Sequence, residues 1–295
     1  MSTAIERPGI VVGVDGSCAA QVAVDWAARD AALRDLSLTV VHIATGLETW
    51  PKMSLPAGFG EWQRNRGHQI IDEAVHIASE AARGTGQRLD IKTEMYYSAT
   101  IPTLIDMSRD AEMVVVGRGG QGKALGALLG SVSSGVTRHA HCPVAVIHDE
   151  DPLMPYPAKA PVLVGVDGSP AAEWATEIAF GEASRRHVDL VALRAWSDAG
   201  AADYPGLNWS SMKSSEDEFL TNHLAGWQDR YPSVRTHRIV VSDRPARQLI
   251  EHSEEAQLVV VGSHGRGGFA GMLLGSVSAA VVQSARMPVI VARRR

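Results

Sequence analysis

Two glycine-rich stretches of the sequence could hold phosphate groups. The first, Met113–Ser134, reads MVVVGRGGQGKALGALLGSVSS, and the second, Leu258–Ala279, reads LVVVGSHGRGGFAGMLLGSVSA. Each passes from a β-branched run through a glycine-rich loop to the motif Gly-Ser-Val-Ser. Glycines let backbone N–H groups approach an anion closely, and a helix start adds unpaired N–H donors and the positive end of the helix dipole. The two stretches therefore predict two phosphate-binding loops.

These loops differ from the P-loop of nucleoside triphosphatases. Gly117 to Lys123 has the spacing G-x-x-x-x-G-K, but Ala124 stands where a P-loop needs Ser or Thr to hold magnesium. In the second stretch Gly268 replaces Lys123. The alternative to anion binding is a tight turn that needs glycine for its backbone geometry alone. Because matched glycines precede a helix start in both copies, anion binding is the favoured interpretation.

An aspartate follows the first strand of each half. The segments GIVVGVDGS and PVLVGVDGS place Asp15 and Asp167 directly after an apolar run. Such a residue is commonly a turn or cap residue. Its functional alternative is a hydrogen-bond acceptor for a base or ribose. In a parallel sheet, ligands bind beyond the carboxyl ends of the strands where the strand order reverses. If strands one and four are neighbours, the aspartate and the glycine loop line one cleft.

Other polar side chains near the loops are weaker candidates. The basic residues Arg118, Lys123 and Arg266 could supply charge to phosphates, although solvated side chains on exposed turns are the alternative. His264 lies inside the second loop, and Asp198 could reach a ligand from the second strand of its half.

No catalytic constellation or metal-ligand spacing emerges from the sequence. It has no G-x-S-x-G motif, and nothing nominates a strong general base. The nearest approach to a metal site is His139 and His141 beside Cys142, but Met287 replaces Cys142 in the other copy. We therefore predict neither catalytic residues nor metal ligands.

The halves repeat one pattern of alternating strands and helices. In the first half we expect strands at Ile10–Val14, Leu38–Ile43, Ile91–Tyr97, Met113–Gly117 and Val144–His148, with helices at Ser17–Leu33, Trp62–Ala82, Pro102–Ser108 and Ser131–His139. In the second we expect strands at Val162–Val166, Asp189–Ala195, His237–Val241, Leu258–Gly262 and Val289–Ala292, with helices at Pro170–Arg186, Ser210–Tyr231, Pro245–Ser253 and Ser276–Ala285. Continuous apolar strands between helices indicate parallel sheets covered on both faces.

The predicted fold class is α/β, with two tandem doubly wound domains. Similar segments recur in the same order at domain-sized separation, which indicates a duplicated domain. The first domain spans residues 1–150 and the second residues 161–295. Residues 151–160 form the linker, inside the proline-rich segment His148–Pro161.

Composition excludes several classes of protein. The chain has 295 residues and a formal net charge of −5, with no long basic run, which argues against a nucleic-acid partner. It has two cysteines, so a cytoplasmic location is expected. No apolar run is long enough to span a membrane, and the N-terminus has no signal-peptide pattern.

The spacing of the glycines resembles that of the tandem universal stress proteins, in the ATP-binding branch found in mycobacteria and other actinobacteria. That family's motif is G-x2-G-x9-G-[ST], which is met by Gly117, Gly120, Gly130 and Ser131 and again by Gly262, Gly265, Gly275 and Ser276. The resemblance covers Ile10 to Ala292. It implies five-stranded Rossmann-like sheets of order 3-2-1-4-5, one ATP per domain with Mg²⁺ as a candidate companion ion, and a homodimer.

The resemblance also implies roles for individual residues. Asp15 and Asp167 fix adenine or ribose, the loop backbones hold the phosphates, and the second strands border the base through Val40–Ala44 and Ala195–Asp198. The full set of nucleotide-binding candidates is Gly13, Asp15, Gly117, Arg118, Gly119, Gly120, Gln121, Gly122, Lys123, Gly130, Ser131 and Val132 in the first domain, and Gly165, Asp167, Asp198, Gly262, Ser263, His264, Gly265, Arg266, Gly267, Gly268, Gly275, Ser276 and Val277 in the second.

The function implied is a nucleotide-dependent regulator of stress response or growth state, acting on a protein partner that the sequence does not identify. Two alternatives stay open. One is a slow ATPase or phosphotransferase, for which the sequence names no positioned water or acceptor. The other is a dimeric scaffold that acts without nucleotide, which the intact glycine spacing in both halves disfavours.

Overall fold

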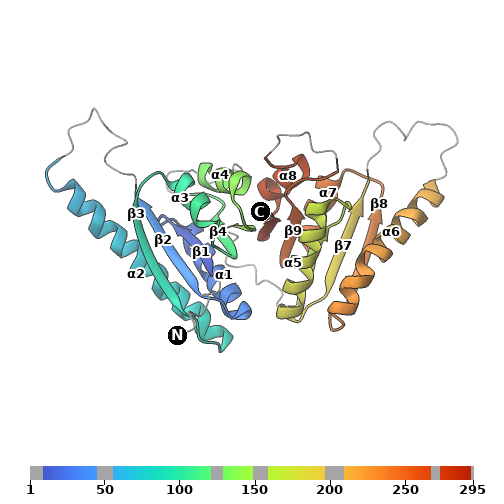
Figure 1. Ribbon diagram of the computed structural model, residues 1–295, viewed down its shortest axis with the longest axis horizontal. Coiled ribbons are helices and arrows are strands. Elements are labelled where there is room, and N and C mark those ends of the chain that lie inside the picture. The colour runs from blue at the N-terminus through green and yellow to red at the C-terminus, as the bar shows by residue number, and fades with distance from the viewer. Residues whose placement is uncertain are drawn as a thin grey trace, which may run out of the picture. The chain divides into compact units, whose positions relative to one another are not determined.

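The computed structural model describes residues 9–44, 56–120, 129–148, 159–196, 209–266 and 273–293. The chain divides into two compact units, Met1–Asp149 and Glu150–Arg294. We refer to them as the first and second domains and describe each by itself (Figure 1).

The first domain is a parallel sheet of order β3-β2-β1-β4-β5. Helix α1 lies beside α2, and α3 lies beside α4 (Figure 1). The elements in chain order are β1 (Ile10–Val14), α1 (Cys18–Arg34), β2 (Leu38–Ala44), α2 (Phe59–Thr85), β3 (Ile91–Tyr97), α3 (Thr100–Met107), β4 (Met113–Gly117), α4 (Ser131–His139) and β5 (Val144–Ile147).

The second domain repeats this topology with the order β8-β7-β6-β9-β10, again all parallel. Its elements are β6 (Val162–Gly165), α5 (Pro170–Arg186), β7 (Leu190–Ala195), α6 (Trp209–Arg230), β8 (Thr236–Val241), α7 (Pro245–Ser253), β9 (Leu258–Gly262), α8 (Ser276–Ser284) and β10 (Val289–Ala292). The predicted α/β class and the order 3-2-1-4-5 are confirmed in both domains.

Two predicted helices of the first domain have the wrong bounds. Helix α2 is longer at both ends than the predicted 62–82, since Gly58 and Gly86 adopt left-handed φ values of 84° and 73° at its two ends. Helix α3 begins at Thr100 rather than at Pro102, because proline is tolerated in the first turn of a helix, where its missing N–H would have no partner.

The central strands are buried on both faces, which explains their unbroken apolar runs. In β4 and β9 the first four residues are at most 3% exposed. Helices α1 and α5 contribute mainly alanines to the core, among them Ala23, Ala27, Ala175 and Ala179. Small side chains let these helices approach the sheet closely, so the turn that precedes each helix lies near the ends of the central strands. None of the described helices is long and apolar enough to cross a membrane.

Candidate functional site

A tight turn after the first strand fixes the aspartate of each domain. Asp15 Oδ1 accepts a hydrogen bond from the backbone N–H of Ser17 at 2.9 Å, and Asp167 Oδ1 accepts one from Ser169 at 2.8 Å. The intervening glycine has a positive φ, 82° at Gly16 and 80° at its counterpart, which favours glycine. The Asp-Gly-Ser sequence therefore orients one carboxylate in each domain.

The second oxygen of each carboxylate faces the glycine loop. A Cβ added to Gly120 would lie 2.7 Å from Asp15 Oδ2, and one added to Gly265 would lie 2.6 Å from Asp167 Oδ2. Asp167 Oδ2 also accepts the backbone N–H of Arg266 at 3.1 Å. A larger residue at either position would have to displace the carboxylate, so the middle glycine of the motif lets the loop and the aspartate approach closely.

The first glycine of each motif packs against a helix. A Cβ on Gly117 would lie 2.7 Å from the backbone oxygen of Ala19, and one on Gly262 would lie 2.7 Å from the carbonyl carbon of Ala171. These glycines let the end of the fourth strand meet the first turn of α1 or α5. Packing therefore explains this position of the motif, whatever the cavity binds.

The third glycine closes the loop and begins a helix. The N–H of Gly130 donates to Arg118 O at 2.8 Å, and that of Gly275 donates to Ser263 O at 2.7 Å. As the N-cap residue, each provides no capping side chain to the helix that follows. The first-turn N–H groups of α4 and α8 thus lie at the loop without a side-chain cap, as in anion-binding helix termini.

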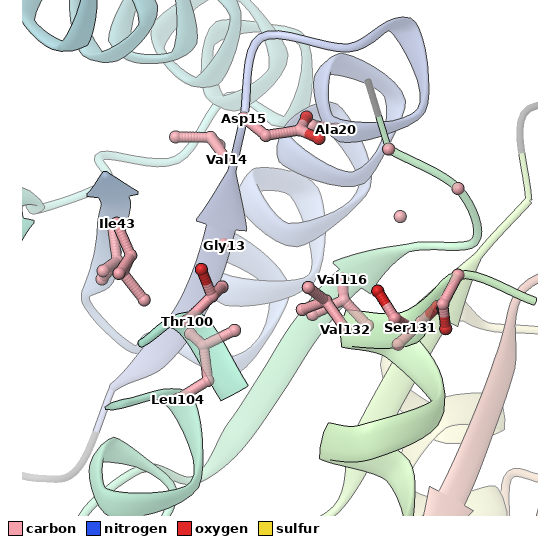
Figure 2. A pocket seen from close by; sticks show the side chains of 16 residues that line it. Gly13, Val14, Asp15, Ala20, Ile43, Thr100, Leu104, Val116, Ser131 and Val132 are labelled. Carbon is pink, nitrogen blue, oxygen red and sulfur yellow. Dashed lines mark hydrogen bonds between the residues drawn. The ribbon is translucent and has the colours of Figure 1, made fainter. Parts of the chain in front are cut away.

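These groups line one cavity of about 270 Å³ in the first domain. In Figure 2, Asp15 lies on one side of the cavity and Ser131 and Val132 on another, while Thr100 and Leu104 approach from α3. The cavity brings together eight of the predicted residues: Gly13, Asp15, Gly117, Gly119, Gly120, Gly130, Ser131 and Val132. Arg118 is not among the residues that line it.

The second domain has the corresponding cavity, of about 530 Å³. Ser263 does not line it; its hydroxyl lies 3.1 Å from His264 Nδ1. The predicted residues that do line it are Gly165, Asp167, Gly262, His264, Gly265, Arg266, Gly275, Ser276 and Val277. The other predicted residues, Gln121, Gly122, Lys123, Asp198, Gly267 and Gly268, lie outside the described residues.

Sequence reasoning missed the contribution of the third helix. Thr100 and Leu104 line the first cavity, and Pro245 and Leu249 line the second. The Cβ of a residue at Gly13 would contact Leu104 at 3.4 Å, and one at Gly165 would contact Leu249 at 3.1 Å. The order of strands and helices could have predicted this contribution. The helix starts where the third strand of its domain ends, at the same edge of the sheet as the glycine loop.

The arginines near the second cavity gather around one aromatic ring. The guanidinium of Arg194 lies 4.1 Å from the centroid of the Phe219 ring, and that of Arg266 lies 5.4 Å from it. Arg194 is also ion-paired with Glu216. Phe219 thus connects α6 to both the second strand and the glycine loop. Among the described residues, no group of three or more His, Cys, Asp or Glu side chains could hold a metal ion.

A doubly wound α/β domain with a glycine loop leading to an uncapped helix start has the architecture of a site for a phosphate-bearing ligand. The sequence pattern of the universal stress protein family matches residues 8–148 and 160–293. The chain belongs to the universal stress protein family, in its tandem-domain form.

Two known members of the family resemble nearly the whole chain, and a third resembles about half of it. Universal stress protein Rv2623 of Mycobacterium tuberculosis is 56% identical over 99% of this chain and 99% of its own length. A crystal structure of a universal stress protein from Archaeoglobus fulgidus has the same fold, with a TM-score of 0.69 and 19% identity, over 97% of this chain and 98% of that one. A further solved universal stress protein, in complex with cAMP, is 26% identical over 48% of this chain and 98% of its own, with a TM-score of 0.34.

Proposed function

We propose that residues 1–150 and 161–295 each bind one ATP and that occupancy of the two cavities regulates a protein partner in stress or growth control. One observation carries the proposal. In both domains a glycine loop, the N-terminus of the following helix and a fixed aspartate converge on a single cavity. The family resemblance to ATP-binding members supports the choice of ATP among phosphate-bearing ligands.

The charge distribution of each cavity supports a division of roles. Backbone N–H groups of the loop and of the helix start would hold the phosphates, since they supply positive dipole without a competing side chain. The carboxylate of Asp15 or Asp167 would repel phosphate, but it could accept hydrogen bonds from ribose hydroxyls or the adenine amino group. Mg²⁺, if it accompanies ATP, would be bound chiefly through phosphate oxygens and water.

The nucleotide content of the purified protein tests this proposal. Protein is denatured, and the extract is analysed by chromatography and mass spectrometry for the wild type and for a Gly120→Glu, Gly265→Glu double variant. We expect about two equivalents of ATP in the wild type and little in the variant, because each glutamate adds bulk and negative charge where the loop meets the aspartate. Gly226→Glu is the matched control, since a Cβ at this exposed position in α6 meets nothing within 4 Å.

Other outcomes separate the alternatives. ADP in place of ATP would favour a slow ATPase, which single-turnover hydrolysis would then measure. Absence of nucleotide, with millimolar ATP failing to raise the melting temperature of the wild type, would refute the ATP proposal. That result would leave the nucleotide-independent scaffold.

The proposed assembly is a cytoplasmic homodimer. The family resemblance supports the homodimer, and the scarcity of cysteine supports the cytoplasmic location. Light scattering coupled to size-exclusion chromatography tests it, with an expected mass of twice 31.5 kDa. A mass of 31.5 kDa at micromolar concentration would contradict it.

A further inference from the structure

The two cavities differ in the loop, where His264 takes the place of Gly119, and also at the end that lies away from the glycine loop. The loop and the helix start lie at one end of each cavity, next to the fourth strand. The other end is formed by the second strand and the third helix, with Leu193 and Pro245 among its lining residues in the second domain. A nucleotide whose phosphates lie at the loop would extend its base toward this far end.

Two neighbouring positions at the end of the second strand differ between the domains: the first domain has a large side chain followed by a small one, and the second domain has the reverse. The strand pairings make Ile43 and Ala44 of β2 equivalent to Ala195 and Trp196, at the end of β7. Ile43 lines the first cavity, whereas both Ala195 and Trp196 line the second. Alanine in place of isoleucine leaves more space at this end, and Trp196 lines both this cavity and a neighbouring one that contains Val241 and Gln248.

Among the residues that the structure describes, the indole of Trp196 has no hydrogen-bond partner. Its backbone N–H donates to Val241 O at 3.1 Å, which fixes the start of the side chain. Its Nε1 is buried, and among the described residues no acceptor lies within hydrogen-bond distance. Buried polar groups nearly always have a partner, and leaving one unpaired is unfavourable. A purely structural tryptophan would be expected to satisfy this donor.

Arg194, the cationic side chain two residues before Trp196, is held by other protein groups and is not available to contact a base. Arg194 is buried, pairs with Glu216, and stacks on Phe219. Its Nη1 lies 3.4 Å from Val166 O, so its donors point toward protein groups. Trp196 is therefore the aromatic group at the far end of the second cavity whose polar atom is still unsatisfied.

On the basis of the proposed function, we propose that Trp196 is a specificity-determining residue that contacts the base in the second cavity. The ring packs against a purine, and a turn of the indole brings its N–H to a ring nitrogen of the base. The first domain has Ala44 at this position, and none of the described residues that line the first cavity is aromatic. The second site is then the tighter of the two and the one that selects for the base.

Calorimetric titration of a chain that carries Gly120→Glu reads the second site alone. ATP is compared with ribose 5-triphosphate, which lacks the base, in chains with Trp196, Trp196→Phe or Trp196→Ala. We expect Trp196→Ala to weaken ATP binding about tenfold, as is typical of lost base stacking. Trp196→Phe, which keeps a ring but removes the donor, should weaken it about threefold. Ribose 5-triphosphate should bind all three chains within about twofold.

Trp62→Ala is the control in the same Gly120→Glu chain, because Trp62 is 62% exposed and is absent from the residues that line the second cavity. Equal losses for ATP and ribose 5-triphosphate in Trp196→Ala would overturn the proposal, since the indole would then only shape the cavity. Unchanged ATP affinity in Trp196→Ala would overturn it as well. Failure of ATP to bind the chain that retains Trp196, or the wild type, would instead refute the proposed function, and this inference with it.

Fluorescence provides a test that needs no alanine variant. The emission of the Gly120→Glu chain is recorded with and without ATP, and the same change is measured for Trp196→Phe. We expect ATP to quench a component of the emission that is missing in Trp196→Phe. An identical ATP response in the two chains would contradict a contact between the base and Trp196.

Discussion

The motif glycines at the phosphate ends of the two cavities are the same, whereas the far ends of the cavities have diverged. A Cβ added to Gly120 would lie 2.7 Å from the Oδ2 atom of its aspartate, and one added to Gly265 would lie 2.6 Å from the corresponding atom. At the far end, Ile43 and Thr100 line the first cavity, whereas Ala195, Trp196 and Pro245 line the second. At the loop end, a Cβ on the first or middle glycine of either motif would lie only 2.6 or 2.7 Å from another atom, so these positions tolerate few changes. An end built from side chains can change while the fold is preserved.

Helices α1 and α5 both contain a buried acidic side chain at equivalent positions, but its ion pairs differ between the two helices. In α1 the buried Asp30 pairs with Arg34, at 2.8 Å. In α5 the equivalent Glu182 is fully buried and pairs with both Arg185 and Arg186, at 2.6 and 2.9 Å. Among the described residues, the buried acid of α1 is thus ion-paired with an arginine one turn away, and that of α5 with two neighbouring arginines. Substitutions at equivalent positions of the two domains therefore measure what each difference contributes to stability or to a pKa.

The largest expected effect is that of Glu182→Gln. Removing one partner of a buried ion pair typically costs about 3–5 kcal/mol, because the remaining charge is left uncompensated. We expect about 3 kcal/mol here, since Arg185 keeps some exposure to solvent. Asp30→Asn leaves the charge of Arg34 without this carboxylate, and it should lower the free energy of unfolding of the first domain by a smaller amount. Hydrogen exchange of β9 and of β4 reports the two domains separately, and a larger loss at β4 in Asp30→Asn would contradict this ranking.

A second comparison concerns the contact of the third and fourth helices. A Cβ at Gly135 in α4 would lie 2.9 Å from Ile101 Cδ1, whereas the equivalent positions of the second domain are Ala280 and Ala246. We expect Gly135→Ala to destabilise the first domain by about 1–2 kcal/mol through overpacking. In an Ile101→Ala chain the same change should be stabilising, by about 0.5–1 kcal/mol, because alanine favours helix.

Denaturant unfolding of the wild type, the Gly135→Ala variant, the Ile101→Ala variant and the double variant measures this coupling. Equal effects of Gly135→Ala in both backgrounds would show that the isoleucine does not select glycine at position 135.

The caps of α1 and α5 differ by one hydrogen bond. Ser17 Oγ and Ser169 Oγ each accept a backbone N–H at 3.2 Å, from Ala20 and Ala172. Ser169 Oγ also donates to His264 O in the glycine loop, at 3.1 Å. Ser17→Ala should therefore cost about 1 kcal/mol, and Ser169→Ala about 0.5–1 kcal/mol more. Thermal unfolding gives the ranking, and Ser→Thr at each position is the control that retains the hydroxyl.

The smallest expected effect is a pH response confined to the second domain. The pKa of Asp243 is lowered from 3.8 by hydrogen bonds from the Arg244 backbone and the Gln248 side chain. Ser98 and Thr103 occupy the equivalent positions in the first domain and form an uncharged hydroxyl pair at 2.7 Å. Because the folded pKa is the lower one, this contribution is present above pH 3.8 and is lost as the pH falls through the folded value.

Carboxyl NMR titration of Asp243 checks this prediction. Gln248→Ala should raise the pKa of Asp243 toward its ordinary value, because one of the two hydrogen bonds is removed. Titration of Asp243 at or above 3.8 in the unsubstituted chain would contradict it.

The sequence by itself determined the strands, the repeat and the parts of the site that depend on glycine. Unbroken apolar runs such as Met113–Val116 are typical of strands buried on both faces, and the repeated motif marked both loops. The Asp-Gly-Ser segments predicted where each aspartate would lie. These features are local, so the identity and spacing of neighbouring residues suffice to predict them.

Only the tertiary structure decided which distant residues meet. Asp15 lies against Gly120, and Leu104 lies against Gly13, because the sheet order places β1 beside β4 and packs α3 over their ends. The same assembly buries the indole of Trp196 without an acceptor among the residues that the structure describes. These facts depend on packing between elements separated by tens of residues, and that packing follows from the global burial of apolar surface rather than from any local pattern.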